Sequence, residues 1–395
     1  MQNLLNQDKG VSLYIWCLVV YIFFIHIESI SVLESFGTVA KLLAIGVAVL
    51  AAISIMVNRQ IIVVGKAELL LVTFFLWCCA TVWWSVDENA AMERLLSVFM
   101  LVFFTILAGF RGFNEREIKV LIQATYYSGS ALALYILTLG EAFHEQVNRI
   151  SLSGTDPNHL SGCLLLAVAI GLSGVFENSG KSIATRLVYF ATLGMIVGAI
   201  VMTGSRGGFL GLFILVLAYF VFTQRYVWVI GLTVTFVCIL LLLWQDPTSR
   251  FSGEMALNSG GAGRVDIWKV GLKVLEENWF IGGGLANFNE LYTLSALQTS
   301  TGFAVGVHRA PHNTIIGMTS EVGIIGLALF IGSIYCLIQR YSDFCDNERI
   351  VLWSALVGIA ISGMFLDMLY MKYLWLVLLL LYGIQRQEIL KAETA

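Results

Sequence analysis

The side chains that could do chemistry are mainly arginines and histidines in short polar turns between apolar segments. Arg206 lies in the turn Gly204-Ser205-Arg206-Gly207-Gly208, and Arg264 follows Gly260-Gly261-Ala262-Gly263 at the start of an expected helix. A guanidinium is a planar fork of donors that matches phosphate oxygens, and a helix N-terminus adds amide donors. Glycines beside an arginine let the backbone approach a ligand closely. The two turns therefore favour anion binding by Arg206 and Arg264. For Arg264, an exposed arginine paired with Asp266 or Glu254 is an equally open interpretation of this segment.

His312 is the candidate general base. A histidine is the side chain whose ordinary pKa suits proton transfer near neutral pH. His308 and Arg309 stand shortly before it, and Asn313 follows it directly. A plainer interpretation is that His312 and Asn313 only cap the next helix, while His308 lines the loop. We take His308, Arg309 and Asn313 as candidate substrate-binding residues around His312.

A second polar turn carries Arg149, followed by Asp156, Asn158 and His159. Arg149 again suggests recognition of an anion, with Asp156 and Asn158 as candidate substrate-binding residues. The Asp-Pro-Asn run is equally typical of a turn that ends in a helix cap. Both interpretations stay open for this segment.

Several classes of site are not indicated. The chain has no Gly-x-x-x-x-Gly-Lys-Ser/Thr loop for ATP and no His-Glu-x-x-His run for zinc. Six of the seven cysteines lie in apolar runs, so neither a disulfide framework nor a cysteine metal site is expected. There is no basic tract for nucleic acid. We therefore expect neither a metal nor another cofactor.

The composition is that of an integral membrane protein. Of the 395 residues, 58% are hydrophobic and 12% are charged, and the mean hydropathy is +0.84, whereas a soluble domain carries about 25% charged residues. A span needs about 20 mainly apolar residues, which predicts twelve transmembrane helices in one membrane domain, residues 1–395. They are 11–28, 38–57, 67–86, 95–110, 118–139, 159–176, 186–203, 208–223, 226–244, 314–338, 350–369 and 371–386.

The distribution of lysine and arginine predicts the orientation. Thirteen of them fall on the side that holds both termini, and five fall on the other side outside the long loop. The richer side is expected to be cytoplasmic, so residues 244–313 form an extracytoplasmic loop between the ninth and tenth spans. Arg206 then faces outward. Because anchoring arginines prefer the cytoplasmic end of a span, we favour anion binding over anchoring for Arg206.

The sequence of the long loop predicts two short helices. Residues 264–278 predict a helix with Val265, Trp268, Leu272 and Leu275 along one apolar stripe. The three glycines at 282–284 predict a turn, and residues 287–297 predict a second short helix. The fold class expected is therefore all-α, with about twelve transmembrane helices and one large loop that contains short helices.

Three motifs resemble the O-antigen ligase and polymerase superfamily. They are the turn 203–208, the run Gly263-Arg264-Val265-Asp266-Ile267-Trp268, and the run Gly154-Thr155-Asp156-Pro157-Asn158. In addition, His312-Asn313 is followed after nine residues by Gly323 and then by Gly326, a pattern similar to the signature of bacterial O-antigen ligases. Twelve spans and one large outward loop also resemble that family.

The resemblance implies a GT-C-type membrane glycosyltransferase of the bacterial inner membrane, with cytoplasmic termini and a periplasmic active site. Its donor would be a glycan on undecaprenyl pyrophosphate, which an O-antigen ligase moves en bloc to a sugar hydroxyl of lipid A–core. The reaction would be metal-independent and inverting. His312 would act as general base, and Arg206 and Arg264, with Arg149, would stabilise the leaving pyrophosphate. A monomer surrounded by membrane lipid is expected.

Three alternatives stay open. A polymerase of the same superfamily would use the same donor but transfer its glycan to another lipid-linked glycan. A protein O-oligosaccharyltransferase is disfavoured, because such enzymes usually carry a long C-terminal region that is not seen here. A lipid-linked glycan transporter is the alternative from a different class, and the scarcity of charges within the spans argues against it.

Overall fold

The computed structural model describes residues 12–28, 34–59, 64–143, 146–152, 155–177, 180–245, 264–296, 309–339 and 347–394. Each of the twelve apolar runs forms a helix. These helices are α1 (Leu13–Glu28), α2 (Glu34–Val57), α3 (Lys66–Thr81), α4 (Glu88–Arg111), α5 (Glu115–Leu139), α6 (Pro157–Phe176), α7 (Ile183–Met202), α8 (Arg206–Phe222), α9 (Tyr226–Gln245), α13 (Thr314–Gln339), α14 (Asn347–Ser362) and α15 (Lys372–Thr394).

Seven of the helices in the described part of the chain are long and apolar enough to cross a membrane, namely α2 to α7 and α13. The helices α1, α8 and the described part of α9 are apolar but shorter. These features are those of an integral membrane protein. That all twelve helices span, and that residues 244–313 lie outside the bilayer, stay predictions.

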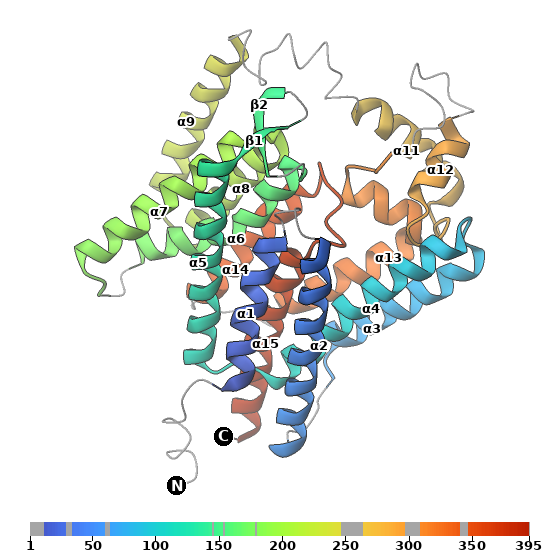
Figure 1. Ribbon diagram of the computed structural model, residues 1–395, viewed down its shortest axis with the longest axis horizontal. Helices are drawn as coiled ribbons and strands as arrows, with labels where there is room; N and C mark the ends of the chain where they lie inside the picture. The colour runs from blue at the N-terminus through green and yellow to red at the C-terminus, as the bar shows by residue number, and fades with distance from the viewer. Residues whose placement is uncertain are drawn as a thin grey trace.

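The helix α6 is the centre of the bundle. It packs against α5, α7, α8 and α14, and Figure 1 places it among them. Small residues along α6 permit this: a Cβ at Gly171 would lie 3.1 Å from Leu193, and one at Gly174 would lie 2.2 Å from Tyr189. Such small residues let helices approach closely where no water drives their association. Central packing fixes the position of the α6 N-terminus, which carries Asp156 and Asn158.

The remaining elements gather above and beside this centre (Figure 1). The helices α3, α4 and α13 form a second group, and α11 (Arg264–Asn278) and α12 (Phe288–Ala296) lie beside α13. A short antiparallel hairpin, β1 (Glu141–Phe143) and β2 (Gln146–Ser151), precedes α6. The hairpin was not expected from the sequence, which indicated only a polar turn there.

Three expected boundaries were wrong by seven residues or more. The helix α4 begins at Glu88 rather than at residue 95. The helix α14 ends at Ser362, seven residues before the predicted end of its span, and α15 runs to Thr394 rather than 386. The residues between them, 363–371, form a non-helical link that we call the 363–371 connection. Its apolar side chains Leu366, Met368 and Leu369 are buried in the bundle, which is why composition alone placed these residues in a span.

The apolar stripe predicted for α11 was also wrong. Val265 and Leu272 are exposed, whereas Ile267, Val270, Gly271 and Val274 are buried. The buried face includes a glycine because a Cβ at Gly271 would lie 2.8 Å from Ile316 on α13. The helix therefore packs closely against α13 at Gly271, while Val265 and Leu272 stay exposed.

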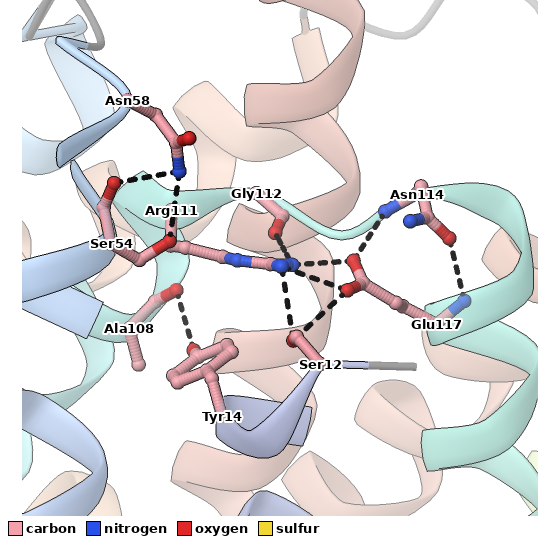
Figure 2. A network of polar contacts seen from close by, with 9 residues as sticks. All are labelled: Ser12, Tyr14, Ser54, Asn58, Ala108, Arg111, Gly112, Asn114 and Glu117. Atoms are coloured by element: carbon pink, nitrogen blue, oxygen red, sulfur yellow. Dashed lines mark hydrogen bonds and ion pairs between the residues drawn. The ribbon is translucent and has the colours of Figure 1, made fainter. Parts of the chain in front are cut away.

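At one end of the bundle, polar side chains join α1, α4 and α5 (Figure 2). Arg111, the last residue of α4, donates to both carboxylate oxygens of Glu117 and to Ser12 Oγ at 3.2 Å. Glu117 also completes a capping box with Asn114 at the start of α5. The side chains of Arg111 and Glu117 are 15% and 4% exposed. This end, where α1 begins and α15 ends (Figure 1), is the one predicted to be cytoplasmic.

We expect Arg111→Met to lower the stability of the protein substantially. Removing one partner of a buried ion pair leaves a buried charge without compensation, which costs about 3–5 kcal/mol. The double variant Arg111→Met/Glu117→Leu should recover most of the loss, because it removes both charges. Thermal unfolding in detergent measures the effect, with the exposed pair Lys119→Met/Glu115→Leu as the control. Equal unfolding temperatures for the single variant and the wild type would contradict this expectation.

Candidate active site

The N-termini of α6 and α8 are held together by a chain of buried hydrogen bonds. Asp156 caps α6 by accepting the Asn158 N–H at 2.8 Å, and Asn158 Nδ2 donates to the same carboxylate oxygen at 2.7 Å. Ser205 Oγ donates to Asn158 Oδ1 at 2.7 Å and accepts the Gly208 N–H at 3.0 Å, which caps α8. Asn158 and Ser205 are 4% and 2% exposed. The two conspicuous turns of the sequence therefore form one unit that fixes Arg206 at the first position of α8.

The glycines of the 203–208 turn serve packing within the protein. A Cβ at Gly207 would lie 2.7 Å from Phe365, and one at Gly208 would lie 2.2 Å from Ser161 Oγ. The sequence suggested that these glycines admit a ligand. In the structure they let α8 lie directly against α6 and the 363–371 connection.

Arg149 reaches this unit from β2. Its guanidinium lies 3.8 Å from the Asp156 carboxylate, and its side chain is 12% exposed. Burial lowers the pKa of Arg149, the Asp156 charge raises it, and the neighbouring Arg206 lowers it further. Arginine remains protonated at any physiological pH, so the two guanidinium groups are fixed positive charges close together.

Arg264 brings a third positive charge from the start of α11. Its guanidinium carbon lies 5.9 Å from the centre of the Phe365 ring, and the Trp268 ring lies 6.3 Å from the same ring. Burial lowers the pKa of Arg264, Asp156 raises it, and Arg149 and Arg206 both lower it. The Arg149, Arg206 and Arg264 side chains, which we call the arginine cluster, therefore share one electrostatic neighbourhood with one carboxylate.

His312 lies at the edge of the arginine cluster. Burial lowers the pKa of His312 below its ordinary value, and Arg264 and Arg309 lower it further, while Asp156 raises it. Its imidazole is therefore neutral at pH 7 and able to accept a proton. The His312 backbone has a φ of 45°, a left-handed conformation that is uncommon for residues other than glycine, although histidine adopts it more often than most. Such backbone conformations concentrate at functional sites, where the surrounding structure enforces them.

The residues after His312 attach α13 to the 363–371 connection. Asn313 Oδ1 accepts the Ile315 and Ile316 N–H groups at 2.9 and 3.1 Å, which caps α13. Thr314 donates its N–H to Gly363 O at 2.8 Å and its hydroxyl to Leu366 O at 2.8 Å. These bonds hold His312 in place relative to Phe365 and hence to Arg264.

The glycine pattern after His312 has a structural basis. Gly323 has a φ of 69° and interrupts α13, and a Cβ there would lie 2.2 Å from Phe280 O. Across the interruption, Gly283 N–H donates to Ser320 O at 2.8 Å and Ile324 N–H donates to Trp279 O at 2.8 Å. The break lets the segment after α11 bond directly to the backbone of α13, which anchors α11 and its Arg264.

The predicted site residues separate into two groups. Arg149, Arg206, Arg264, Arg309, His312 and Asp156 share one electrostatic neighbourhood. Asn158 and Asn313 are buried and bind helix ends and backbone, which leaves little of either side chain for a substrate. His308 and residues 260–263 lie outside the described residues.

Sequence reasoning missed Phe365 and Tyr370, because the 363–371 connection was assigned to a span. Their signal was the density of polar and aromatic residues, including Asp367 and Lys372, at the end of an otherwise apolar run. Among the described residues, no group of three or more His, Cys, Asp or Glu side chains is placed to hold a metal ion. That the reaction is metal-independent stays a prediction.

Comparison with known proteins supports a ligase family. Residues 190–331, which include Arg206, Arg264, His312 and the glycine pattern, match the family model described as O-Antigen ligase. A protein of Rickettsia prowazekii (strain Madrid E) named "Putative polysaccharide ligase" is 23% identical over 294 residues, 72% of this chain and 69% of the relative. A protein of Rickettsia typhi (strain ATCC VR-144 / Wilmington), also named "Putative polysaccharide ligase", is 22% identical over 294 residues, 72% of this chain and 69% of the relative. Together with the membrane bundle, these similarities support an O-antigen ligase-type function in general, that of a glycosyltransferase-like membrane enzyme.

Proposed function

We propose that this protein is an O-antigen ligase that transfers a glycan en bloc from undecaprenyl pyrophosphate to a sugar hydroxyl of lipid A–core, at the periplasmic face of the bacterial inner membrane. The observation that supports the proposal is that three arginines, from β2, α8 and α11, share one electrostatic neighbourhood with Asp156, and that Arg264 acts electrostatically on His312. A leaving pyrophosphate needs such a concentration of fixed positive charge.

The mechanism is a single displacement. The acceptor oxygen attacks the anomeric carbon of the first sugar, and the bond from that carbon to the pyrophosphate oxygen breaks as the new glycosidic bond forms. The proton of the acceptor hydroxyl goes to the neutral imidazole of His312. The pyrophosphate leaves with the bonding electrons, and the arginine cluster stabilises the charge that develops on it. Attack opposite the leaving group inverts the anomeric centre.

Asp156 has a positioning role in this mechanism. Its carboxylate lies 3.8 Å from Arg149 and raises the pKa of both Arg264 and His312. It therefore offsets part of the repulsion among three half-buried arginines when no substrate is bound. Asp156 also caps α6, so its carboxylate is held in place by the central helix of the bundle.

The experiment that tests the function combines purified protein with lipid-linked glycan and lipid A–core. Glycan joined to the core supports the ligase. Longer lipid-linked glycan would identify the polymerase, which uses the same donor and the same arginine cluster. Failure to form any new glycosidic bond, with binding of lipid-linked glycan retained, would favour the transporter.

The pH dependence of transfer tests the state of His312. The base must be neutral, so kcat/KM falls as the pH drops through the pKa of His312. Because burial and two arginines lower that pKa from its ordinary value of 6.5, the acidic limb should lie below pH 6.5. Arg264→Gln removes one of the lowering charges, so the residual activity of that variant should have its acidic limb at higher pH. An acidic limb at the same pH in Arg264→Gln and the wild type would contradict the electrostatic effect of Arg264 on the pKa of His312.

A further inference from the structure

A large cavity lies beside the 363–371 connection, which contributes Tyr370 to its lining. This cavity, which we call the chamber, has a volume of about 700 Å³ and is lined by α1, α2, α4, Ala286, Asn289, Tyr370 and Lys372. A second cavity of about 370 Å³, the groove, lies between α2 and α4. The two share Ala44, Met100 and Phe104 in their linings, so they adjoin each other.

The groove is suited to a hydrocarbon chain. All ten of its lining side chains are apolar, and Ile45, Val49 and Phe103 on its sides are 43%, 51% and 46% exposed. Both α2 and α4 are long and apolar enough to cross a membrane. A ligand can therefore enter the groove sideways from the lipid, with no polar group in its path.

The chamber is suited to a polar headgroup. Tyr370 Oη donates to Glu321 Oε2 at 2.9 Å, and the Arg94 guanidinium lies 4.1 Å from the centre of the Tyr370 ring. Lys372 pairs with Glu28, and the exposed Lys41 also lines the chamber. Ser97 and Asn289 add a hydroxyl and an amide. Mixed donors, acceptors and positive charges of this kind suit sugar hydroxyls and phosphates.

The chamber and the arginine cluster share a wall. Lys372 lines the chamber, and the next residue, Tyr373, places its ring 5.6 Å from that of His159. His159 follows Asn158 on α6, beside Asp156. Along the 363–371 connection, Tyr370 faces the chamber while Phe365 lies under Arg264. The 363–371 connection therefore contributes residues both to the surroundings of Arg264 and to the lining of the chamber.

We infer that the chamber and groove bind the acceptor, a membrane-anchored glycolipid with hydroxyl-bearing and phosphorylated sugars. Its hydrocarbon chain lies in the groove between α2 and α4, and its sugars lie in the chamber. The inference rests on the proposed function, in which both substrates are carried by lipids. Because the arginine cluster is assigned to the donor pyrophosphate, the second substrate needs a separate space that opens to lipid and ends at the cluster.

The test measures the binding of each substrate separately by native mass spectrometry of the full-length protein in detergent. The probes are lipid A–core alone and undecaprenyl-pyrophosphate-linked glycan alone. Ala44→Trp and Met100→Trp fill the space where groove and chamber join, and Leu187→Trp adds the same side chain at a position on α7 that is 62% exposed. We expect each groove variant to weaken binding of lipid A–core about tenfold or more, with donor binding and unfolding temperature unchanged. Leu187→Trp should bind both probes as the wild type does.

Two results would overturn the inference. If both groove variants lose the donor and keep lipid A–core, the groove holds the donor instead. If folded groove variants bind both probes normally, the groove holds neither substrate. The proposed function fails on a different measurement, namely the absence of transfer by the wild-type protein. If the wild type binds lipid A–core through the groove but transfers no glycan, the acceptor-binding site stands and the proposed ligase function fails.

Discussion

His312→Asn is expected to lower kcat for glycan transfer by about 10²–10⁴-fold, the usual contribution of a positioned general base. The acceptor hydroxyl is unactivated and must lose its proton as it attacks. Asparagine removes the base and tolerates the left-handed backbone conformation, with a φ of 45° at this position. The variant therefore separates loss of the base from loss of the fold.

Two controls make the His312 result interpretable. His312→Ala removes the same base with a residue less suited to positive φ, so a lower stability in that variant alone would report backbone strain. Transfer by His312→Asn should also lose the acidic limb of its pH profile, because that limb belongs to the imidazole. A folded His312→Asn protein that transfers glycan at the wild-type rate would exclude His312 as the base.

Arg264→Gln is expected to lower kcat by about 10²–10³-fold, the effect of removing one preorganised donor from a developing oxyanion. The guanidinium is half-buried, and Arg149 and Arg206 act on it electrostatically, so its charge is felt strongly by a ligand at the arginine cluster. Because that charge grows on the pyrophosphate as the bond breaks, the effect should fall on kcat more than on KM.

Lys269→Gln is the matched control for Arg264→Gln. Lys269 lies on the same helix, α11, and its side chain is 63% exposed in a pair with Asp266. The substitution removes the same charge from the same element but leaves the arginine cluster intact, so transfer should stay near the wild-type rate. Equal losses in the two variants would mean that only the net charge of α11 matters.

The element content of this protein could be predicted from its sequence because apolar runs of span length have few alternatives in a membrane. All twelve runs became helices, and α11 begins and ends where its pattern placed it. Hydrophobic periodicity gave a wrong prediction for the buried face of α11, because close packing against α13 decides which face is buried. The buried face of α11 contains Gly271, which has no hydrophobicity to reveal it, and the break at Gly323 depends on a backbone contact from residues 279–284.

The candidate site could be predicted in part. The residue types of Arg206, Arg264 and His312 indicated anion binding and proton transfer, and the structure brings them together. The sequence could not distinguish residues that contact a substrate from residues that only hold the site in place. Asn158 has the same polar signal as a substrate-binding residue, yet its side chain joins Asp156 to Ser205 inside the bundle. Only the three-dimensional arrangement distinguishes these roles.

The 363–371 connection has a consequence for how two substrates would influence each other. Phe365 lies under Arg264 on one side, and Tyr370 lines the chamber on the other. A ligand that displaces this connection from either side must change the affinity for the opposite ligand. Thermodynamic linkage requires that the change be reciprocal and equal in both directions. Measuring the affinity for one substrate in the presence and absence of the other therefore gives the free energy of coupling between the two sites through these nine residues.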